Sequence, residues 1–290
     1  MPSPARPEPV EGAPEPLRIG WYTTRGRSSR AMFEAVRDAI QGGSLHARIA
    51  YVSSNRDPGD DPVTDAFFDL VRAEGIPLLT LGSVAFRKAH GGERSQPGAP
   101  LPGWRADYDA AVARLVDAHP ADLGVLAGYM LIFTPAFADE HPLVNLHPAL
   151  PGGPIGTYVE VIRALIRTRA TESGVMLNVA IPEVDMGPVA AFCRYPIRGG
   201  DFDAMWNALG DDLEGLNDAA IEATPLFERI RAAQVEHEAP FLVSALQAFA
   251  DGRLRLVDGA VEATSGAAPL DLTADVRARL GRAVDGAPRR

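Results

Sequence analysis

Short apolar runs alternate with amphipathic stretches from about residue 17 to residue 196. The apolar runs, which predict strands, cover residues 17–23, 47–53, 76–81, 123–129, 143–146, 174–181 and 188–196. Stretches with apolar residues at helical spacing predict helices over residues 29–40, 64–74, 106–118 and 158–169. This alternation favours an α/β fold with a doubly wound, mostly parallel sheet flanked by helices, of Rossmann type. Ligands of such sheets bind beyond the carboxyl ends of the strands, so the loops at these ends are the first candidates for a binding site.

The two ends of the chain depart from the alternation. The first 16 residues contain six prolines and cannot form a core, so we expect a disordered Pro-rich tail over 1–16. The stretch after about residue 262 is rich in Ala, Asp and Arg, and we interpret 263–290 as a C-terminal extension. A further helix is predicted over 219–231.

Charge and cysteine content narrow the class of protein. Lys and Arg number 28 against 38 Asp and Glu, a net charge of −10, which argues against nucleic acid and anionic membranes as partners. The single cysteine, Cys193, excludes disulfides within the chain and multi-Cys metal sites, and suits the cytoplasm. We expect neither a secretory signal nor a membrane span, because no apolar run reaches about 18 residues.

A positively charged loop follows the first predicted strand. Gly26 permits a tight turn, and Ser28 and Ser29 can cap the next helix while leaving backbone N–H groups for an anion. Arg27 and Arg30 add local positive charge in an acidic protein. The stretch is neither a Walker loop nor a G-x-G-x-x-G fingerprint. A solvated loop with an ordinary serine cap remains the alternative to a phosphate site.

The segment Val144–Pro148 carries an amide and an imidazole at a strand end. Asn145 and His147 are two residues apart on an extended segment, so their side chains share one face. An amide and an imidazole can stabilise an oxyanion and move a proton. Asp185, in a Gly-Pro turn, is a candidate to orient His147. Each of these side chains could instead satisfy only local backbone groups.

Taken in order, four segments resemble the folate-dependent formyltransferases. They are VLAGYM (125–130) with TPAF (134–137), NLHPALP (145–151), VDMGPV (184–189), and Glu236-His237 with FADGRL (249–254). The resemblance implies a formyltransferase-like fold and a catalytic domain over 17–262, with insertions near 88–103 and 200–231. The branch it points to transfers the formyl group of 10-formyltetrahydrofolate, as co-substrate, to the amine of glycinamide ribonucleotide in purine biosynthesis.

The resemblance also implies roles for individual residues. Asn145, His147 and Asp185 form the catalytic group, in which Asn145 and protonated His147 stabilise the oxyanion and Asp185 keeps His147 charged. No metal is required. The acceptor and its phosphate are bound by Gly26, Arg27, Ser28, Ser29, Arg30 and Glu236. The folate is bound by Met130, Leu131, Ile132, Phe133, Ile181 and Val184.

Several positions depart from the family pattern. The loop at Gly26 lacks a second glycine and an asparagine, Leu131 replaces a usual arginine, and Asn178 stands where a histidine is usual. These departures keep other functions open: a formyltetrahydrofolate hydrolase, a formyltransferase for another amine, or a folate- or nucleotide-binding protein without turnover. The expected partners are a folate and a phosphorylated amine; whether the chain forms a homodimer stays open.

Overall fold

The computed structural model describes residues 15–96, 99–210, 213, 215–264 and 266–285. Residues 1–14 of the predicted tail therefore lie outside the described part. The main sheet is made of β1 (Leu17–Thr23), β2 (Ala47–Ser54), β3 (Leu78–Thr80), β4 (Leu123–Leu126), β5 (Leu143–His147), β6 (Glu172–Val179), β7 (Val189–Pro196) and β10 (Leu270–Asp271). A separate hairpin consists of β8 (Leu254–Val257) and β9 (Ala260–Ala263).

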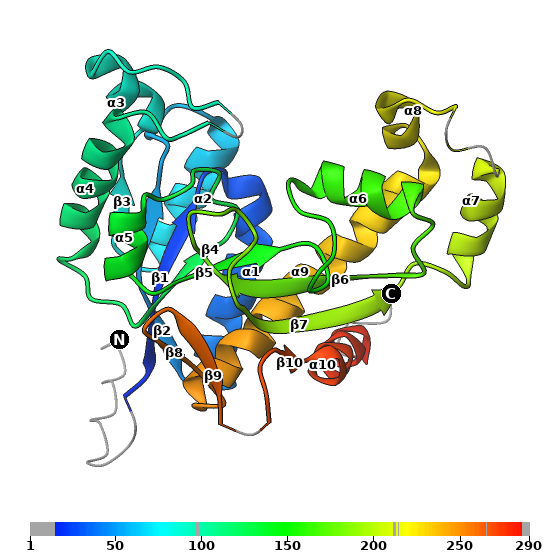
Figure 1. Cartoon of the computed structure of the whole chain (residues 1–290). Coiled ribbons are helices and arrows are strands. Elements are labelled where there is room, and N and C mark those ends of the chain that lie inside the picture. Colours follow the sequence, from blue (N-terminus) through cyan, green and yellow to red (C-terminus); the bar gives the residue numbers. More distant parts are fainter. Residues whose placement is uncertain (1–14, 97–98, 211–212, 214, 265, 286–290) are drawn as a thin grey trace.

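Helices flank the main sheet (Figure 1). They are α1 (Gly26–Gln41), α2 (Pro62–Ala73), α3 (Ser83–Ala89), α4 (Trp104–Val116), α5 (Pro135–Glu140), α6 (Tyr158–Arg167), α7 (Asp201–Leu209), α8 (Asp218–Glu222), α9 (Pro225–Ala250) and α10 (Thr273–Asp285). None of the helices in the described ranges is both long enough and apolar enough to cross a membrane.

The order of the strands confirms the mostly parallel, doubly wound sheet. The order is β10-β7-β6-β5-β4-β1-β2-β3. β6 is antiparallel to its neighbours β5 and β7, and the other strand pairs of this sheet are parallel. From β1 the chain first builds outward to β3 and then crosses over to β4 on the other side. The direction of winding thus reverses between β1 and β4, and ligands of such sheets bind at this point.

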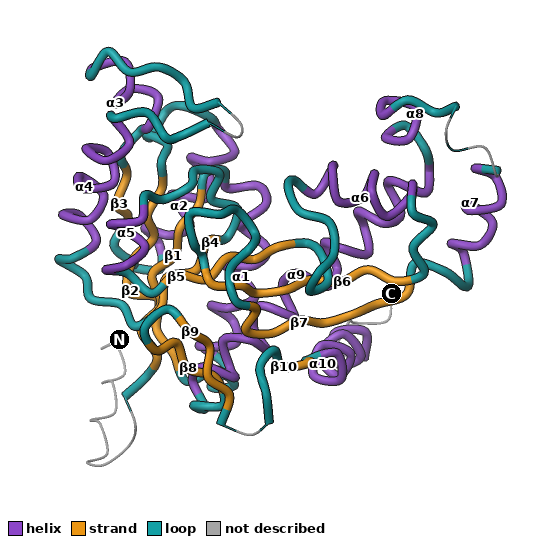
Figure 2. The backbone as a smooth tube through the Cα atoms, in the orientation of Figure 1, coloured by secondary structure: helices purple, strands orange, loops and turns teal. Residues whose placement is uncertain are grey.

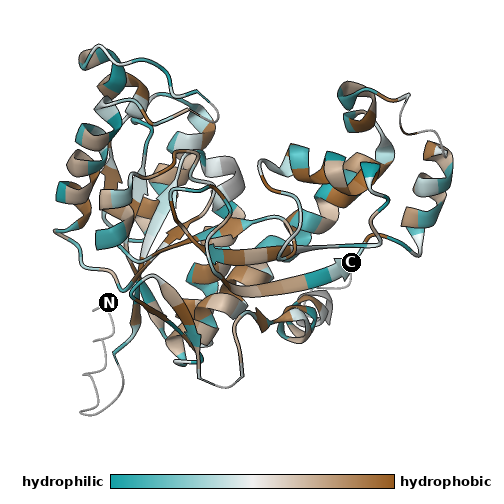
Figure 3. Ribbon diagram, viewed as in Figure 1, coloured by the Kyte–Doolittle hydropathy of each residue, from teal (hydrophilic) through white to brown (hydrophobic). Residues whose placement is uncertain are grey.

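Alternating side chains of the sheet feed two apolar layers. In β1, Ile19 and Trp21 belong to the core shared with α1, α2 and α9, whereas Tyr22 belongs to the aromatic core under α4 and α5. This is the period-2 alternation of a strand buried on both faces. Figure 3 shows the central strands mainly in the brown of hydrophobic residues. Because apolar layers cover both faces of the sheet, we expect the polar site at the ends of the strands.

Several predicted boundaries were wrong. α1 begins at Gly26 rather than residue 29, and its N-cap is Arg25, without a side-chain hydrogen bond. Ser28 and Ser29 therefore lie inside the helix rather than at its N-cap. β4 ends at Leu126 rather than residue 129, and the chain turns through Gly128 at φ 74°. α3 (Ser83–Ala89) extends into the start of segment 88–103, where the family resemblance placed an insertion.

The region 200–231 differs most from the prediction. In place of one helix over 219–231, the chain forms α7, the short α8 and the 26-residue α9, which runs to Ala250. Thr224 caps α9 by accepting the Phe227 N–H, and Pro225 occupies its first turn. The C-terminal extension also has structure: β10 pairs with β7, and α10 packs on α9.

Candidate active site

The loops that follow β1 and β4 meet where the winding of the sheet reverses (Figure 2). Thr24, just after β1, donates its N–H to the Gly128 carbonyl at 3.1 Å. Its hydroxyl accepts the N–H of Met130 at 2.8 Å. These bonds tie the loop after β1 to the loop after β4, so the predicted acceptor and folate segments share one edge of the sheet.

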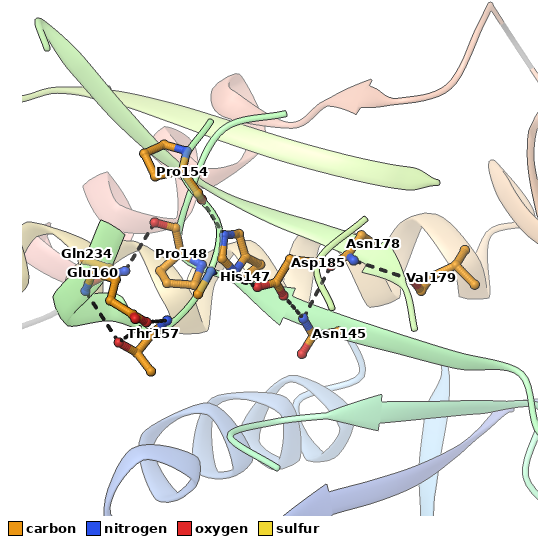
Figure 4. A network of polar contacts seen from close by, with 11 residues as sticks. Asn145, His147, Pro148, Pro154, Thr157, Glu160, Asn178, Val179, Asp185 and Gln234 are labelled. Atoms are coloured by element: carbon orange, nitrogen blue, oxygen red, sulfur yellow. Dashed lines mark hydrogen bonds and ion pairs between the residues drawn. The ribbon is translucent and has the colours of Figure 1, made fainter. Parts of the chain in front are cut away.

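Asn145, His147 and Asp185 lie in contact at this edge (Figure 4). His147 Nδ1 is 3.2 Å from Asp185 Oδ2, and these side chains are 2% and 5% exposed. Asn145 Nδ2 donates to Asp185 Oδ1 at 2.9 Å. β5 supplies the first two residues, and the β6–β7 turn supplies the third. The structure thus brings together the residues predicted to form the catalytic group.

Both ring nitrogens of His147 face hydrogen-bond acceptors. Nδ1 faces the Asp185 carboxylate, and Nε2 lies 2.9 Å from the Pro154 carbonyl oxygen. A carboxylate and a carbonyl only accept hydrogen bonds, so a neutral ring, which carries one N–H, can donate to only one of them, whereas an imidazolium would donate to both.

Asp185 is held in an unusual conformation. Its φ is 60°, a left-handed value that costs free energy for a residue other than glycine. The carboxylate compensates by accepting the Gly156 N–H at 3.1 Å in addition to its other bonds. Burial by itself would raise the pKa of Asp185, but the hydrogen bond and charge of His147, aided by Gly156 and Asn145, lower the pKa below its usual value. Asp185 is therefore a stable anion.

Asn178 on β6 completes the group. It is 1% exposed, and its Oδ1 accepts a second hydrogen bond from Asn145 Nδ2 at 3.4 Å. The two strands place these residues opposite each other in antiparallel register. Asn178 was noted in the sequence as a departure but was not predicted to act, because only the pairing of β5 with β6 reveals the contact.

The first turn of α1 holds the predicted phosphate residues, but some are used differently than expected. The Ser29 hydroxyl is buried and accepts the Trp21 indole N–H at 2.7 Å, so it serves the core. Arg30 pairs with Glu34 at 2.9 Å on the surface. Arg27 and Ser28 belong to the same turn, but their side chains lie outside the described part. Gly26 is buried, and a Cβ added at this position would lie 2.6 Å from Phe67 Cβ of α2.

Most of the predicted folate residues present apolar surface. Met130 is 64% exposed, Ile132 38% and Val184 46%. Leu131 and Ile181 are half-buried. Exposed apolar side chains that gather near polar groups are typical of a ligand site. Phe133 differs: it is buried and stacks on Phe137 and Tyr129, so it supports the loop from within the core.

A pocket of about 880 Å³ lies beside this loop. Its walls include Pro100 and Leu101 from the predicted insertion, Ile132 and Thr134 from the loop, and Pro182 from the β6–β7 turn. The pocket thus adjoins two of the predicted folate segments, and the segment predicted as an insertion contributes one of its walls.

Two residues that the sequence interpretation missed anchor the loop after β4. Arg105 and Asp109, both 1% exposed, are one turn apart on α4. Arg105 donates to the Ile132 carbonyl at 2.5 Å, and Asp109 accepts the Thr134 N–H at 2.6 Å. Burial raises the pKa of Asp109 despite these partners. An Arg and an Asp at i,i+4 on a predicted helix could have indicated this pair, but exposed ion pairs on helices have the same spacing.

α9 approaches the site through Gln234 rather than Glu236. Gln234 is buried, and its Nε2 donates to the Pro148 carbonyl at 3.3 Å. Glu236 is exposed on α9, and among the described residues no hydrogen bond links it to His147 or Asp185. The described ranges also contain no cluster of three or more His, Cys, Asp or Glu side chains able to hold a metal ion.

Comparison with known families agrees with this geometry. The model of the formyl transferase family matches residues 27–209, more than half of the chain. The chain belongs to the formyl transferase family. Curated relatives of this formyl transferase include the phosphoribosylglycinamide formyltransferase of Escherichia coli K12, 26% identical over 78% of this chain and 85% of the relative. That of Dictyostelium discoideum is 28% identical over 58% of this chain and 79% of the relative.

Solved structures share the fold of this formyl transferase. Glycinamide ribonucleotide transformylase 1 from Symbiobacterium toebii has a TM-score of 0.60 at 22% identity, over 88% of this chain and 98% of that one. A formyltetrahydrofolate deformylase from Burkholderia mallei has a TM-score of 0.55 at 14% identity, over 86% of this chain and 71% of that one. At these identities the likeness concerns the fold alone.

Proposed function

We propose that this formyl transferase moves the formyl group of 10-formyltetrahydrofolate to the amine of glycinamide ribonucleotide, a step of purine biosynthesis in the cytoplasm. The contact of Asn145, His147 and Asp185 at the reversal point of the sheet carries the proposal. The names of the curated relatives support this choice of reaction.

His147 supplies the charge that the reaction needs. When the amine attacks the formyl carbon, negative charge develops on the formyl oxygen, and a fixed positive group stabilises it. The Pro154 carbonyl now occupies the acceptor position at His147 Nε2, 2.9 Å away. We assign that position to the formyl oxygen when the donor is bound. Asp185 keeps the imidazolium oriented and charged through Nδ1.

The two substrates would enter from opposite sides. The exposed apolar side chains of Met130, Ile132 and Val184 suit the flat pterin of the donor. The N-terminal turn of α1 suits the phosphate of the acceptor, because its backbone N–H groups and the helix dipole favour an anion. Arg30 adds positive charge, and Glu236 stays a proposed contact to the acceptor sugar. None of these steps needs a metal ion.

The test is an assay of the purified full chain. We expect release of the formyl group from 10-formyltetrahydrofolate, followed by folate absorbance, to depend on added glycinamide ribonucleotide. Release at the same rate without any amine would indicate a hydrolase. Saturable folate binding without release, with or without the amine, would indicate a binding protein. Either result would overturn the proposal.

A further inference from the structure

We propose that Gln234 on α9, held by Arg231, is a positioning residue for the transfer: it holds the Pro148 carbonyl and so fixes the direction of the His147 imidazole. The inference rests on the proposed function, because one of its readouts is turnover in that reaction. It concerns a polar cluster of Arg231, Gln234 and Glu238, to which the family resemblance assigned no role.

The three residues of the cluster lie on one face of α9, because side chains three, four and seven residues apart follow one another along a helix. Arg231 Nη1 donates to Gln234 Oε1 at 2.8 Å and to Glu238 Oε1 at 3.0 Å. The guanidinium of Arg231 also lies 4.1 Å from the ring centre of Tyr158, the first residue of α6. An opposite charge and an aromatic face thus hold the guanidinium in place.

Arg231 determines how the amide of Gln234 is turned. Because Arg231 donates to Oε1, the amide nitrogen Nε2 faces the other way and donates to the Pro148 carbonyl at 3.3 Å. In the reverse orientation the NH2 group would face the guanidinium, which only donates, and the amide oxygen would face a carbonyl, which only accepts. Both contacts would be repulsive, so only one orientation of the amide suits both neighbours.

The bond to Pro148 holds the backbone next to the imidazole. His147 is the last residue of β5 and pairs with Met176 of β6, and the ring of Pro148 restricts the next φ angle. With the Pro148 carbonyl held from α9, the backbone is restrained on both sides of His147 (Figure 4). The direction in which the imidazole leaves the backbone depends on these restraints, so α9 helps to determine where Nε2 points.

This restraint matters most when the donor is bound. In the structure, Asp185 faces Nδ1 of His147 and the Pro154 carbonyl faces Nε2. In the proposed mechanism the formyl oxygen takes the place of the Pro154 carbonyl, so the ring loses one of its contacts within the chain. Gln234 contacts neither ring nitrogen, and its bond to Pro148 can persist while Nε2 faces the substrate. Accurate aim is needed there, because a misplacement of about 1 Å can cost on the order of 100-fold in rate.

Gln234→Met removes the amide and keeps a flexible side chain of similar length. We expect kcat to fall about 3- to 10-fold, the effect of one hydrogen bond. KM should stay unchanged for both substrates, because Gln234 is buried and contacts neither of them in the proposed arrangement. A wild-type kcat in the folded variant would overturn the proposal. A raised KM for glycinamide ribonucleotide with an unchanged kcat would also overturn it, since Gln234 would then serve binding.

Gln234→Glu separates positioning from a purely structural role. Its carboxylate still accepts from Arg231, but it places an oxygen against the Pro148 carbonyl in place of an N–H. At about pH 8, where an ordinary carboxyl is ionised, we expect kcat to fall at least as far as in Gln234→Met. If Gln234 served only to satisfy Arg231, kcat would equal that of wild type, and this result would reject the positioning role.

Arg231 acts through Gln234 in this proposal, so the effects of removing the two side chains should not multiply. We expect Arg231→Met to lower kcat about 2- to 5-fold, and the double variant with Gln234→Met to be no slower than Gln234→Met alone. Arg231→Lys keeps a charged donor and should retain most of the wild-type kcat. Losses that multiply in the double variant, or a lysine variant as slow as Arg231→Met, would contradict the action through Gln234.

NMR of the His147 imidazole tests the positioning without turnover. In protein with isotope-labelled histidine, we expect one sharp His147 signal in wild type, assigned by its loss in His147→Ala. The signal should broaden or split in Gln234→Met, because the imidazole is then held less firmly. An unchanged signal would overturn the proposal.

Ser244→Ala is the matched control on the same helix. It also removes a buried polar group that donates to a backbone carbonyl, and it should leave both kcat and the His147 signal unchanged. An equal effect in this variant would overturn the role of Gln234. Wild-type turnover with glycinamide ribonucleotide is measured in parallel. Its absence refutes the proposed function itself, whereas the NMR result decides the positioning role separately.

Discussion

Asn145, His147 and Asp185 are held by contacts with one another, whereas the first turn of α1 is held by packing against the core. The polar side has hydrogen bonds of 2.9 Å from Asn145 and 3.1 Å from Gly156 to the same carboxylate. At the start of α1, Gly26 lies against Phe67, and Ser29 is tied to Trp21. The polar group is thus fixed by directional hydrogen bonds, whereas the start of α1 is fixed by the fit of Gly26 and Ser29 against the core.

The largest expected effect is on the polar side. His147→Ala removes the positive charge beside the formyl oxygen, and we expect the rate of transfer to fall by about 10²-fold or more, as for general acid–base groups. Steady-state assays with both substrates measure this loss. Thermal unfolding serves as the control for folding. A rate within tenfold of wild type would contradict the expectation that the polar group carries most of the catalytic effect.

Asp185→Asn weakens the same group more mildly. Loss of a hydrogen bond from a charged partner is worth about 1.5–3 kcal/mol, so we expect the rate to fall about 10- to 100-fold. The variant still offers an oxygen to one of the partners of Asp185, which is why a smaller effect than for His147→Ala is expected.

The lowered pKa of Asp185 also has a consequence for stability at low pH. A carboxyl whose folded pKa is depressed stabilises the fold above its unfolded pKa and loses this contribution as the pH falls through the folded pKa. The stability difference between wild type and Asp185→Asn should therefore be constant above about pH 5 and shrink below about pH 4. Urea unfolding at several pH values tests this, and a difference that shrinks between pH 8 and 6 would contradict it.

At the start of α1, a single added methyl group is expected to lower both the unfolding free energy and the affinity for the acceptor. Gly26→Ala places a Cβ 2.6 Å from Phe67 Cβ and 3.0 Å from the Val63 carbonyl oxygen. Overpacking of this kind costs about 1–3 kcal/mol of unfolding free energy. We also expect weaker acceptor binding, because the first turn of α1 must shift. Folate binding is the internal control and should be unchanged.

The smallest effect is expected for charge at the same turn. Arg30 is half-exposed and already paired with Glu34, so Arg30→Ala should weaken acceptor binding only about 2- to 3-fold at low salt and less at high salt. Arg37→Ala, farther along α1 and paired with Asp38, is the matched control and should have no effect. An equal loss for both variants would indicate a general charge effect rather than a phosphate site.

Local patterns predicted the parts of the site that depend on few neighbours. The spacing of Asn145 and His147 on a strand placed both side chains on one face, and both contact Asp185. The start of α1 and the role of Ser29 were not predictable in this way, because they depend on contacts with α2 and with Trp21. Arg105 and Asp109 were missed for the same reason: their partners are backbone groups 25 to 27 residues away.

The sequence by itself determined the alternation of strands and helices and the residue types of the catalytic group, because periodicity and strand geometry are short-range properties. The tertiary structure alone decided which atoms those residues present. Only the pairing of β5 with β6 and the left-handed turn at Asp185 direct the Asn145 amide nitrogen inward, since both acceptors come from distant segments.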